Sequence, residues 1–138
     1  MKRSITQAVG LFLALAVAGC GSKVAKYEAL VDETFTVYTD LADALESVKD
    51  DASATAAAKK IHSAFDHLEE IGKKAHALPK LSQSDTEMLE KKYRSDLKKL
   101  SKRVESAGFQ AGKYAGKNKD LLNAIKRQET VDMFPFPF

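Results

Sequence analysis

The chain has 138 residues, of which 44% are hydrophobic and 30% are charged, and its 22 basic and 19 acidic residues give a formal net charge of +3. This composition is typical of one globular domain and excludes a disordered chain. Two of the basic residues, Lys2 and Arg3, lie at the extreme N-terminus, so the rest of the chain is nearly neutral and its charge does not favour nucleic-acid binding.

The N-terminal segment has the three-part layout of an export signal. Lys2 and Arg3 are followed by an uncharged, mostly apolar run of 11 residues at 8–18, and then by the small residue Gly19. The run is too short to span a bilayer, which takes about 20 apolar residues. We therefore predict that residues 1–19 are a signal peptide.

Cys20 is the only cysteine, so it cannot form an internal disulfide or a thiolate metal site. The sequence Val17-Ala18-Gly19-Cys20 resembles the lipobox of bacterial lipoproteins. In that class the cysteine thiol carries a diacylglyceryl group, the signal is cut just before the cysteine, and the new amino group is usually acylated. The resemblance covers residues 1–20 only, and it implies that Cys20 is a lipid attachment site followed by a short tether over 20–22.

The same resemblance implies a location. In this class, an Asp directly after the cysteine favours retention in the inner membrane, and this chain has Gly21 there. We therefore expect a lipid-anchored protein of a bacterial membrane, and in a cell with two membranes we expect it on the outer membrane, facing the periplasm.

The mature chain opens with a predicted helix from residue 23 to near Lys49. Its apolar side chains recur at helical spacing in two series and widen into a broad stripe, which indicates contact with two neighbouring elements. The helix should end where 50–53 offer turn and N-cap chemistry. The stripe contains Tyr27, Leu30, Val31, Thr34, Phe35, Val37, Tyr38, Leu41, Ala44, Leu45 and Val48.

A second helix is predicted from about Ala52 to Leu78, and Pro79 should end it. Its alanine-rich start has high helix propensity. Its apolar series contains Ala54, Ala57, Ile61, Ala64, Phe65, Leu68, Ile71, Ala75 and Leu78.

A third helix opens at 82–87, where Ser82 with Asp85 and Ser84 with Glu87 both match the capping-box spacing. Its apolar residues are Leu89, Tyr93, Leu97, Leu100, Val104, Ala107 and Ala111. A break is expected near 116–118, after which Asn118 or Asp120 caps a shorter helix with Leu121, Leu122 and Ile125.

These elements predict an all-α fold: an antiparallel three-helix bundle over 23–130, with or without a short fourth helix. Residues 23–51 carry 3 basic and 8 acidic side chains, whereas 85–127 carry 12 basic and 6 acidic ones, so the first and third helices should pair by charge. The alternative is that the basic run of the third helix faces anionic lipid head groups, and we favour intramolecular pairing or plain solvation of the run. That run contains Lys91, Lys92, Arg94, Lys98, Lys99, Lys102 and Arg103.

The three histidines, His62, His67 and His76, all fall on the second helix at spacings of five and nine. Metal ligands on one helix stand three or four residues apart, so these side chains do not converge, and we predict no metal site. The chain also lacks the Cys-x-x-Cys-His motif of covalent haem attachment, and no cofactor is predicted.

Two further features, the glycines around Phe109 and the tail rich in Phe and Pro, lie outside the apolar stripes of the helices. Gly108, Gly112 and Gly116 stand four residues apart around Phe109, which lies off the stripe, so Phe109 could dock the chain's own end or a partner. The tail over 131–138 carries three Phe alternating with two Pro, which favours an extended segment. Four placements stay open for it: on the bundle, in a partner's groove, against the membrane, or as a loosely ordered terminus.

The sequence contains no glycine-rich phosphate loop, no nucleophile elbow and no paired acids with a reason to be buried, so we predict that the protein is not an enzyme. The function that fits best is a membrane-anchored lipoprotein whose periplasm-facing helical body acts in binding or scaffolding, with the membrane and a protein as its partners. The alternative is a small bundle that carries a ligand or a metal.

Overall fold

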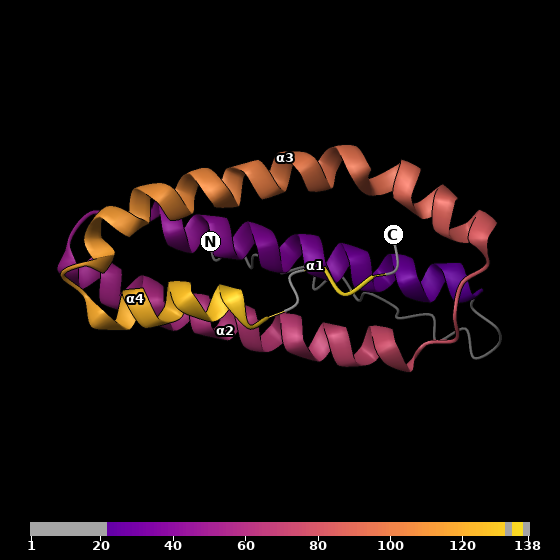
Figure 1. Cartoon of the computed structure of the whole chain (residues 1–138), viewed down its shortest axis with the longest axis horizontal. Coiled ribbons are helices and arrows are strands. Elements are labelled where there is room, and N and C mark those ends of the chain that lie inside the picture. The colour runs from indigo at the N-terminus through magenta and orange to yellow at the C-terminus, as the bar shows by residue number, and fades with distance from the viewer. Residues whose placement is uncertain (1–21, 132–133, 137–138) are drawn as a thin grey trace, which may run out of the picture.

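The computed structural model describes residues 22–131 and 134–136, and this part of the chain is a bundle of α-helices (Figure 1). The predicted all-α fold is confirmed, with a short fourth helix. The elements are α1 (Lys23–Glu46), α2 (Asp51–Ala77), α3 (Gln83–Ala115), α4 (Lys119–Lys126) and a 3-10 turn, η1 (Arg127–Glu129).

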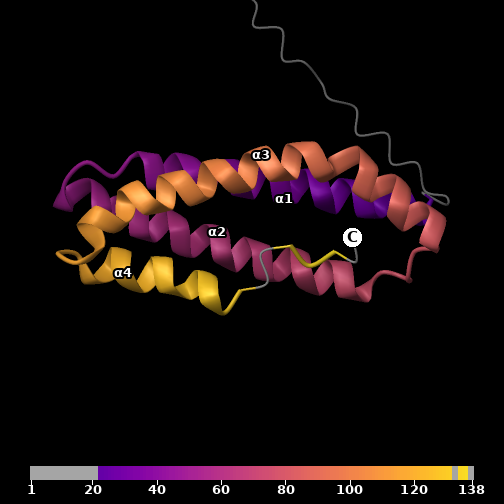
Figure 2. The ribbon, with the colours of Figure 1, turned by 45° about the horizontal axis from the view of Figure 1, so that its top comes forward.

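Successive helices run antiparallel and are joined by short connections (Figures 1 and 2). α1 packs along both α2 and α3, which touch each other little. α4 packs on α2 and α3, and it runs beside α2 in the same direction. The result is an up-down-up-down bundle whose fourth member is much shorter than the other three.

The connection between α1 and α2 has the predicted N-cap chemistry, but it begins earlier in the chain than expected. α2 starts with a capping box, in which the Asp50 carboxylate accepts from the Ser53 amide and the Ser53 hydroxyl accepts from the Asp50 amide. The same hydroxyl accepts from the Lys49 amide, so this residue belongs to the turn. α1 therefore ends at Glu46 rather than near Lys49, although Val48 is still buried.

α3 begins at the first of the two sites that the sequence offered. The Ser82 hydroxyl accepts from the Asp85 amide at 3.1 Å, so Ser82 is the N-cap and Ser84 lies inside the helix. The helix has 33 residues, which corresponds to a length of about 50 Å.

The predicted break between α3 and α4 is confirmed. α3 ends at Ala115 with Gly116 as its C-cap, and Asn118 is the N-cap of α4. Asn118 is buried, and its side-chain oxygen accepts from the Leu121 amide at 2.9 Å. Its side-chain nitrogen donates to the Asp51 carboxylate at 2.8 Å and to the Thr55 hydroxyl at 2.9 Å, which ties the start of α4 to the start of α2.

Replacing Asn118 with Ala is expected to lower the free energy of unfolding by about 1–2 kcal/mol, because the cap and the buried hydrogen bonds are lost together. Asn118→Asp should be at least as destabilising at neutral pH, since it sets a second carboxylate beside Asp51. The difference in free energy of unfolding between Asn118→Asp and Asn118→Ala should become smaller at low pH, because protonation of one carboxylate removes the repulsion. Urea titrations followed by circular dichroism measure both changes, with the exposed Asn123→Asp as the control. An Asn118→Asp variant as stable as the unmodified chain would contradict this role.

The far end of α4 is tied to α2 by Arg127. One guanidinium nitrogen lies 2.7 Å from both the Asp66 and the Glu69 carboxylates, and the other donates to the His62 carbonyl at 3.3 Å. The hydrogen bonds to Glu69 and Asp66 raise the pKa of Arg127. α4 is therefore held on α2 at both of its ends.

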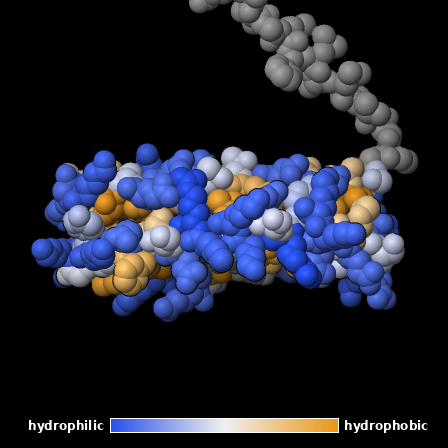
Figure 3. All heavy atoms as spheres, turned by 90° about the horizontal axis from the view of Figure 1, so that it is seen from above, coloured by the Kyte–Doolittle hydropathy of each residue, from blue (hydrophilic) through white to orange (hydrophobic). Residues whose placement is uncertain are grey.

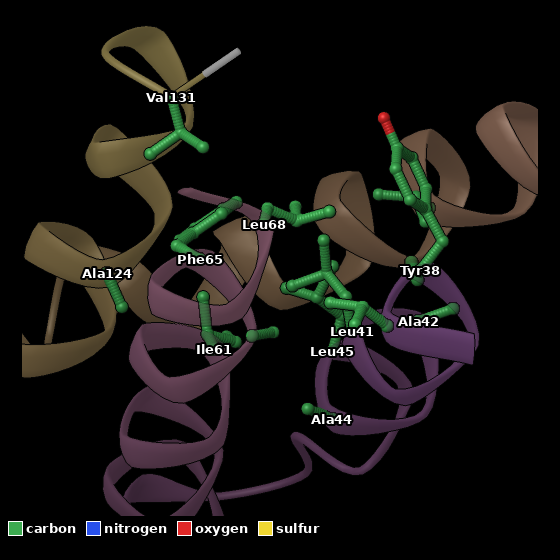
Figure 4. Close-up of a cluster of buried hydrophobic side chains, with 14 of the residues drawn as sticks. Tyr38, Leu41, Ala42, Ala44, Leu45, Ile61, Phe65, Leu68, Ala124 and Val131 are labelled. Carbon is green, nitrogen blue, oxygen red and sulfur yellow. The ribbon is translucent and has the colours of Figure 1, made fainter. Parts of the chain in front are cut away.

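The hydrophobic core runs through the middle of the bundle (Figure 4). Phe65 and Ile61 of α2 lie between Ala124 of α4 on one side and Leu41 and Leu45 of α1 on the other. All residues of the core cluster lie between Tyr27 and Phe136, so the helical body from Ser22 onward contains the described core entirely.

Residues 134–136 of the tail pack on the bundle, which selects one of the four placements left open by the sequence for this part of the chain. Phe136 is only 8% exposed, and its ring meets Tyr27 of α1 edge-on at a centroid distance of 6.5 Å. Phe134 stacks edge-on against Phe136 at 4.9 Å, and Pro135 lies against Gly72 of α2. This part of the tail therefore lies beyond the end of α4, in the half of the bundle that α4 does not reach (Figure 1).

The predicted charge pairing of the first and third helices is also present. Arg103 of α3 lies 2.5 Å from the Asp43 carboxylate and 2.7 Å from that of Glu46, and Lys92 lies 2.6 Å from that of Glu28. Hydrogen bonds from Arg103 lower the pKa of Glu46. These exposed contacts fix which helices are neighbours more than they add to stability.

Candidate functional site

Cys20, the predicted lipid attachment site, lies outside the described residues, which begin at Ser22. Ser22 is the N-cap of α1, and its hydroxyl accepts from the Ala25 amide at 3.2 Å. The folded helix thus begins three residues after Cys20, with only Gly21 between the cysteine and the cap. The candidate site is therefore the end of the bundle at which α1 begins.

We call this end the tether end, and define it as residues 22–26 and 74–86. It contains the first turn of α1, the last turn of α2, the connection between α2 and α3, and the first turn of α3 (Figure 1). The Lys23 ammonium donates to the Lys80 carbonyl at 3.4 Å, which joins the start of α1 to the connection. The tail also reaches this end, where Phe136 contacts Tyr27.

A pocket of ≈ 470 Å³ opens beside the tail at the tether end. Most of its lining is apolar, while His76, Lys80 and Thr86 supply polar groups. Such a lining suits an amphipathic molecule with an apolar part and an acceptor group for a cation. The remaining lining residues are Tyr27, Ala75, Leu78, Leu81, Phe134, Pro135 and Phe136.

The sequence did not single out this pocket, although part of the signal was present. Leu78 and Leu81 flank Pro79 in the connection, where two apolar residues outside a helix are unusual for a solvated loop. Both are half-buried against the core. The sequence cannot show that Phe134 and Phe136, more than fifty residues later in the chain, also line this pocket.

The three histidines do not come together, as their spacing predicts. His67 Nε2 lies 2.7 Å from a Glu33 carboxylate oxygen, which also accepts from Lys74 at 3.1 Å. Burial raises the pKa of Glu33, but the hydrogen bonds from His67 and Lys74 outweigh it, so the pKa lies below its usual value. His76 lines the pocket instead. Among residues 22–131 and 134–136 there is no group of three or more His, Cys, Asp or Glu side chains placed to hold a metal ion.

The basic run of α3 is partly neutralised by its own surroundings. Lys92 and Arg103 pair with acidic residues of α1, while Arg94 and Lys99 pair with Glu90 and Asp96 of α3 itself. The face of the molecule seen in Figure 3 is largely hydrophilic, with apolar groups in separate patches. The run begins at Lys91, beyond the tether end, and follows α3 along the side of the bundle (Figure 1).

Phe109 is 74% exposed, and its ring lies 5.9 Å from the Lys113 ammonium. A side chain added at Gly108 or Gly112 would meet nothing within 4 Å, so these glycines leave an open strip beside it. The expectation that Phe109 could dock the chain's own end is wrong for the described part of the tail, because Phe134–Phe136 lie against α1 and α2. Docking of a partner at Phe109 stays a prediction.

The chain matches no protein-family model, no curated protein and no solved structure. Across the helices that the structure describes, none combines the length and the apolar character that crossing a membrane requires.

Proposed function

We propose that this chain is a bacterial lipoprotein, anchored to a membrane through lipid on Cys20, whose helical body acts in binding or scaffolding. The observation that carries the proposal is the sequence Val17-Ala18-Gly19-Cys20 at the end of an 11-residue uncharged run with a cationic start. Because Gly21 follows the cysteine, the proposed location in a cell with two membranes is the periplasmic face of the outer membrane.

The start of α1 supports a close association between body and bilayer. Two residues beyond Cys20 span about 7 Å when extended, and Ser22 is already the helix cap. Two acyl chains make a stable anchor, so a lipidated Cys20 would hold the tether end at the lipid surface. The helices would then project from the membrane by up to the length of α3.

The proposal is tested by Cys20→Ser in a bacterial host. We expect this variant to incorporate no labelled palmitate, to keep the mobility of the unprocessed chain, and to lose partition into the detergent phase. Ser22→Ala is the matched control, because it alters the helix cap and leaves the cysteine in place. A Cys20→Ser protein that stays with membranes at the processed size would overturn the assignment.

The pocket at the tether end supports a second candidate, a bundle that carries a small amphipathic ligand. Its apolar lining and the nearby His76 and Lys80 match such a molecule better than they match a metal ion. Native mass spectrometry of the processed protein separates the two candidates. A bound mass beyond that of the polypeptide and its covalent lipid favours the carrier, and a bare mass favours the scaffold.

A further inference from the structure

The two ends of the bundle differ in charge. The tether end carries four basic residues, Lys23, Lys26, Lys74 and Lys80, and one acidic residue, Asp85. The opposite end, residues 43–54 and 112–121, carries four basic and five acidic residues. The molecule therefore presents a cationic surface on the side from which the chain leads to Cys20.

Three of these cations have no acidic partner within ion-pair distance in the described structure. Lys74 is paired with Glu33, whereas Lys23, Lys26 and Lys80 are exposed and form no ion pair there. The nearest acidic groups have partners of their own. The Asp85 carboxylate accepts from the Ser82 hydroxyl at 2.7 Å. Glu87 and Glu28 lie one and two residues beyond the tether end, and they accept from Gln83 and Lys92.

Apolar side chains accompany the cations. Met88 at the start of α3 is 48% exposed, and Pro79 is exposed beside the half-buried Leu78 and Leu81. Leu78 and Leu81 line the pocket together with Lys80. Cations mixed with accessible apolar groups are typical of protein surfaces that rest on the interface of an anionic bilayer.

We propose that the tether end docks on an anionic lipid surface, with Lys23, Lys26 and Lys80 on the head groups and the helices projecting away from the bilayer. This inference rests on the lipoprotein function proposed above, since the short tether is what holds these lysines at the surface. Each lysine near an anionic membrane favours binding by about fivefold, so three contribute about a hundredfold. The attraction fades within a Debye length and is weakened by salt.

The lysines of α3 are the natural alternative surface and provide the control. Their run lies along the side of the bundle, and several of its members are paired within the fold. Lys98 and Lys102 of α3, together with Lys117 just beyond the end of α3, are exposed and lie outside the tether end. Converting these three to Glu changes the net charge by the same amount as converting Lys23, Lys26 and Lys80.

The test uses the helical body from Ser22 onward, checked for helicity by circular dichroism, and sedimentation with vesicles of neutral phosphatidylcholine or of phosphatidylcholine with phosphatidylglycerol. We expect binding to the anionic vesicles only, reversed by salt. The Lys23→Glu, Lys26→Glu, Lys80→Glu variant should bind at least tenfold more weakly. The control triple variant should bind within about threefold of the unmodified body. Equal losses in both variants, or no binding to anionic vesicles, would overturn the proposal.

A second measurement covers the case in which the isolated body does not fold. Here the full processed protein is reconstituted into the same two kinds of vesicle, and trypsin cleavage after Lys80 is timed. Cleavage should be at least several-fold slower on anionic vesicles than on neutral ones, with high salt removing the difference. Equal rates would refute docking. A Cys20→Ser protein that stays with membranes at the processed size, by contrast, would refute the anchor and leave the vesicle result standing.

Discussion

Replacing Phe65 with Ala is expected to lower the free energy of unfolding by about 3–5 kcal/mol. Phe65 is 1% exposed and lies in α2, between Ala124 of α4 and Leu41 of α1 (Figure 4). The surrounding helices are tied together by caps and ion pairs, so they cannot close fully on the space that a lost ring leaves. The loss should therefore combine the transfer free energy of the ring with the cost of a cavity.

Chemical denaturation followed by circular dichroism at 222 nm measures this loss. Phe109→Ala is the matched control, because the same change at a ring that is 74% exposed should alter stability by less than about 0.5 kcal/mol. Similar effects at the two positions would show that Phe65 is not part of a packed core.

Replacing Phe136 with Ala is expected to lower the free energy of unfolding by about 2–3 kcal/mol, less than at Phe65 although both rings are buried. The difference arises because Phe136 lies outside the helices, in a segment that follows the last helical turn. When its ring is removed, the tail can leave the bundle, so the loss cannot exceed the whole free energy of docking the tail. The helices would stay folded around the remaining core.

Because the loss is limited to the free energy of docking the tail, substitutions within the tail should not be additive. Phe134→Ala in addition to Phe136→Ala should add little, since a tail that has already left the bundle cannot lose more contacts. The same denaturation measurement applies, with hydrogen exchange at Gly72 and Ala75 of α2 as a local readout. Additive losses from the two substitutions would show that the tail does not dock as one unit.

Much of the fold could be predicted because local chemistry decides it. The turn and N-cap chemistry predicted over 50–53 lies before the second helix, and the break predicted near 116–118 separates the third helix from a fourth. The side chains concerned satisfy amides within a few residues of their own position, so the signal is contained in a short stretch of chain.

Two choices stayed open at the level of the sequence: the N-cap of α3 and the placement of the tail. Ser82 and Ser84 have the same local spacing to an acidic residue, so the sequence could not choose between them. The placement of the tail depends on segments far away in the chain. Its prolines predict an extended shape, but the groove that receives Phe136 is built by Tyr27, more than a hundred residues earlier in the chain. Cys20 shows the opposite situation, because its predicted role rests on sequence alone and lies outside the described residues.

The length of α3 has a consequence for where partners can meet this protein. Phe109 lies about 39 Å along the helix from Gln83. If the tether end rests on lipid, the Phe109 ring lies further from the head groups than the Debye length over which their charge acts. A protein that binds there would approach from the aqueous compartment, so the helical body would act as a spacer that sets the height of a docking point above the membrane.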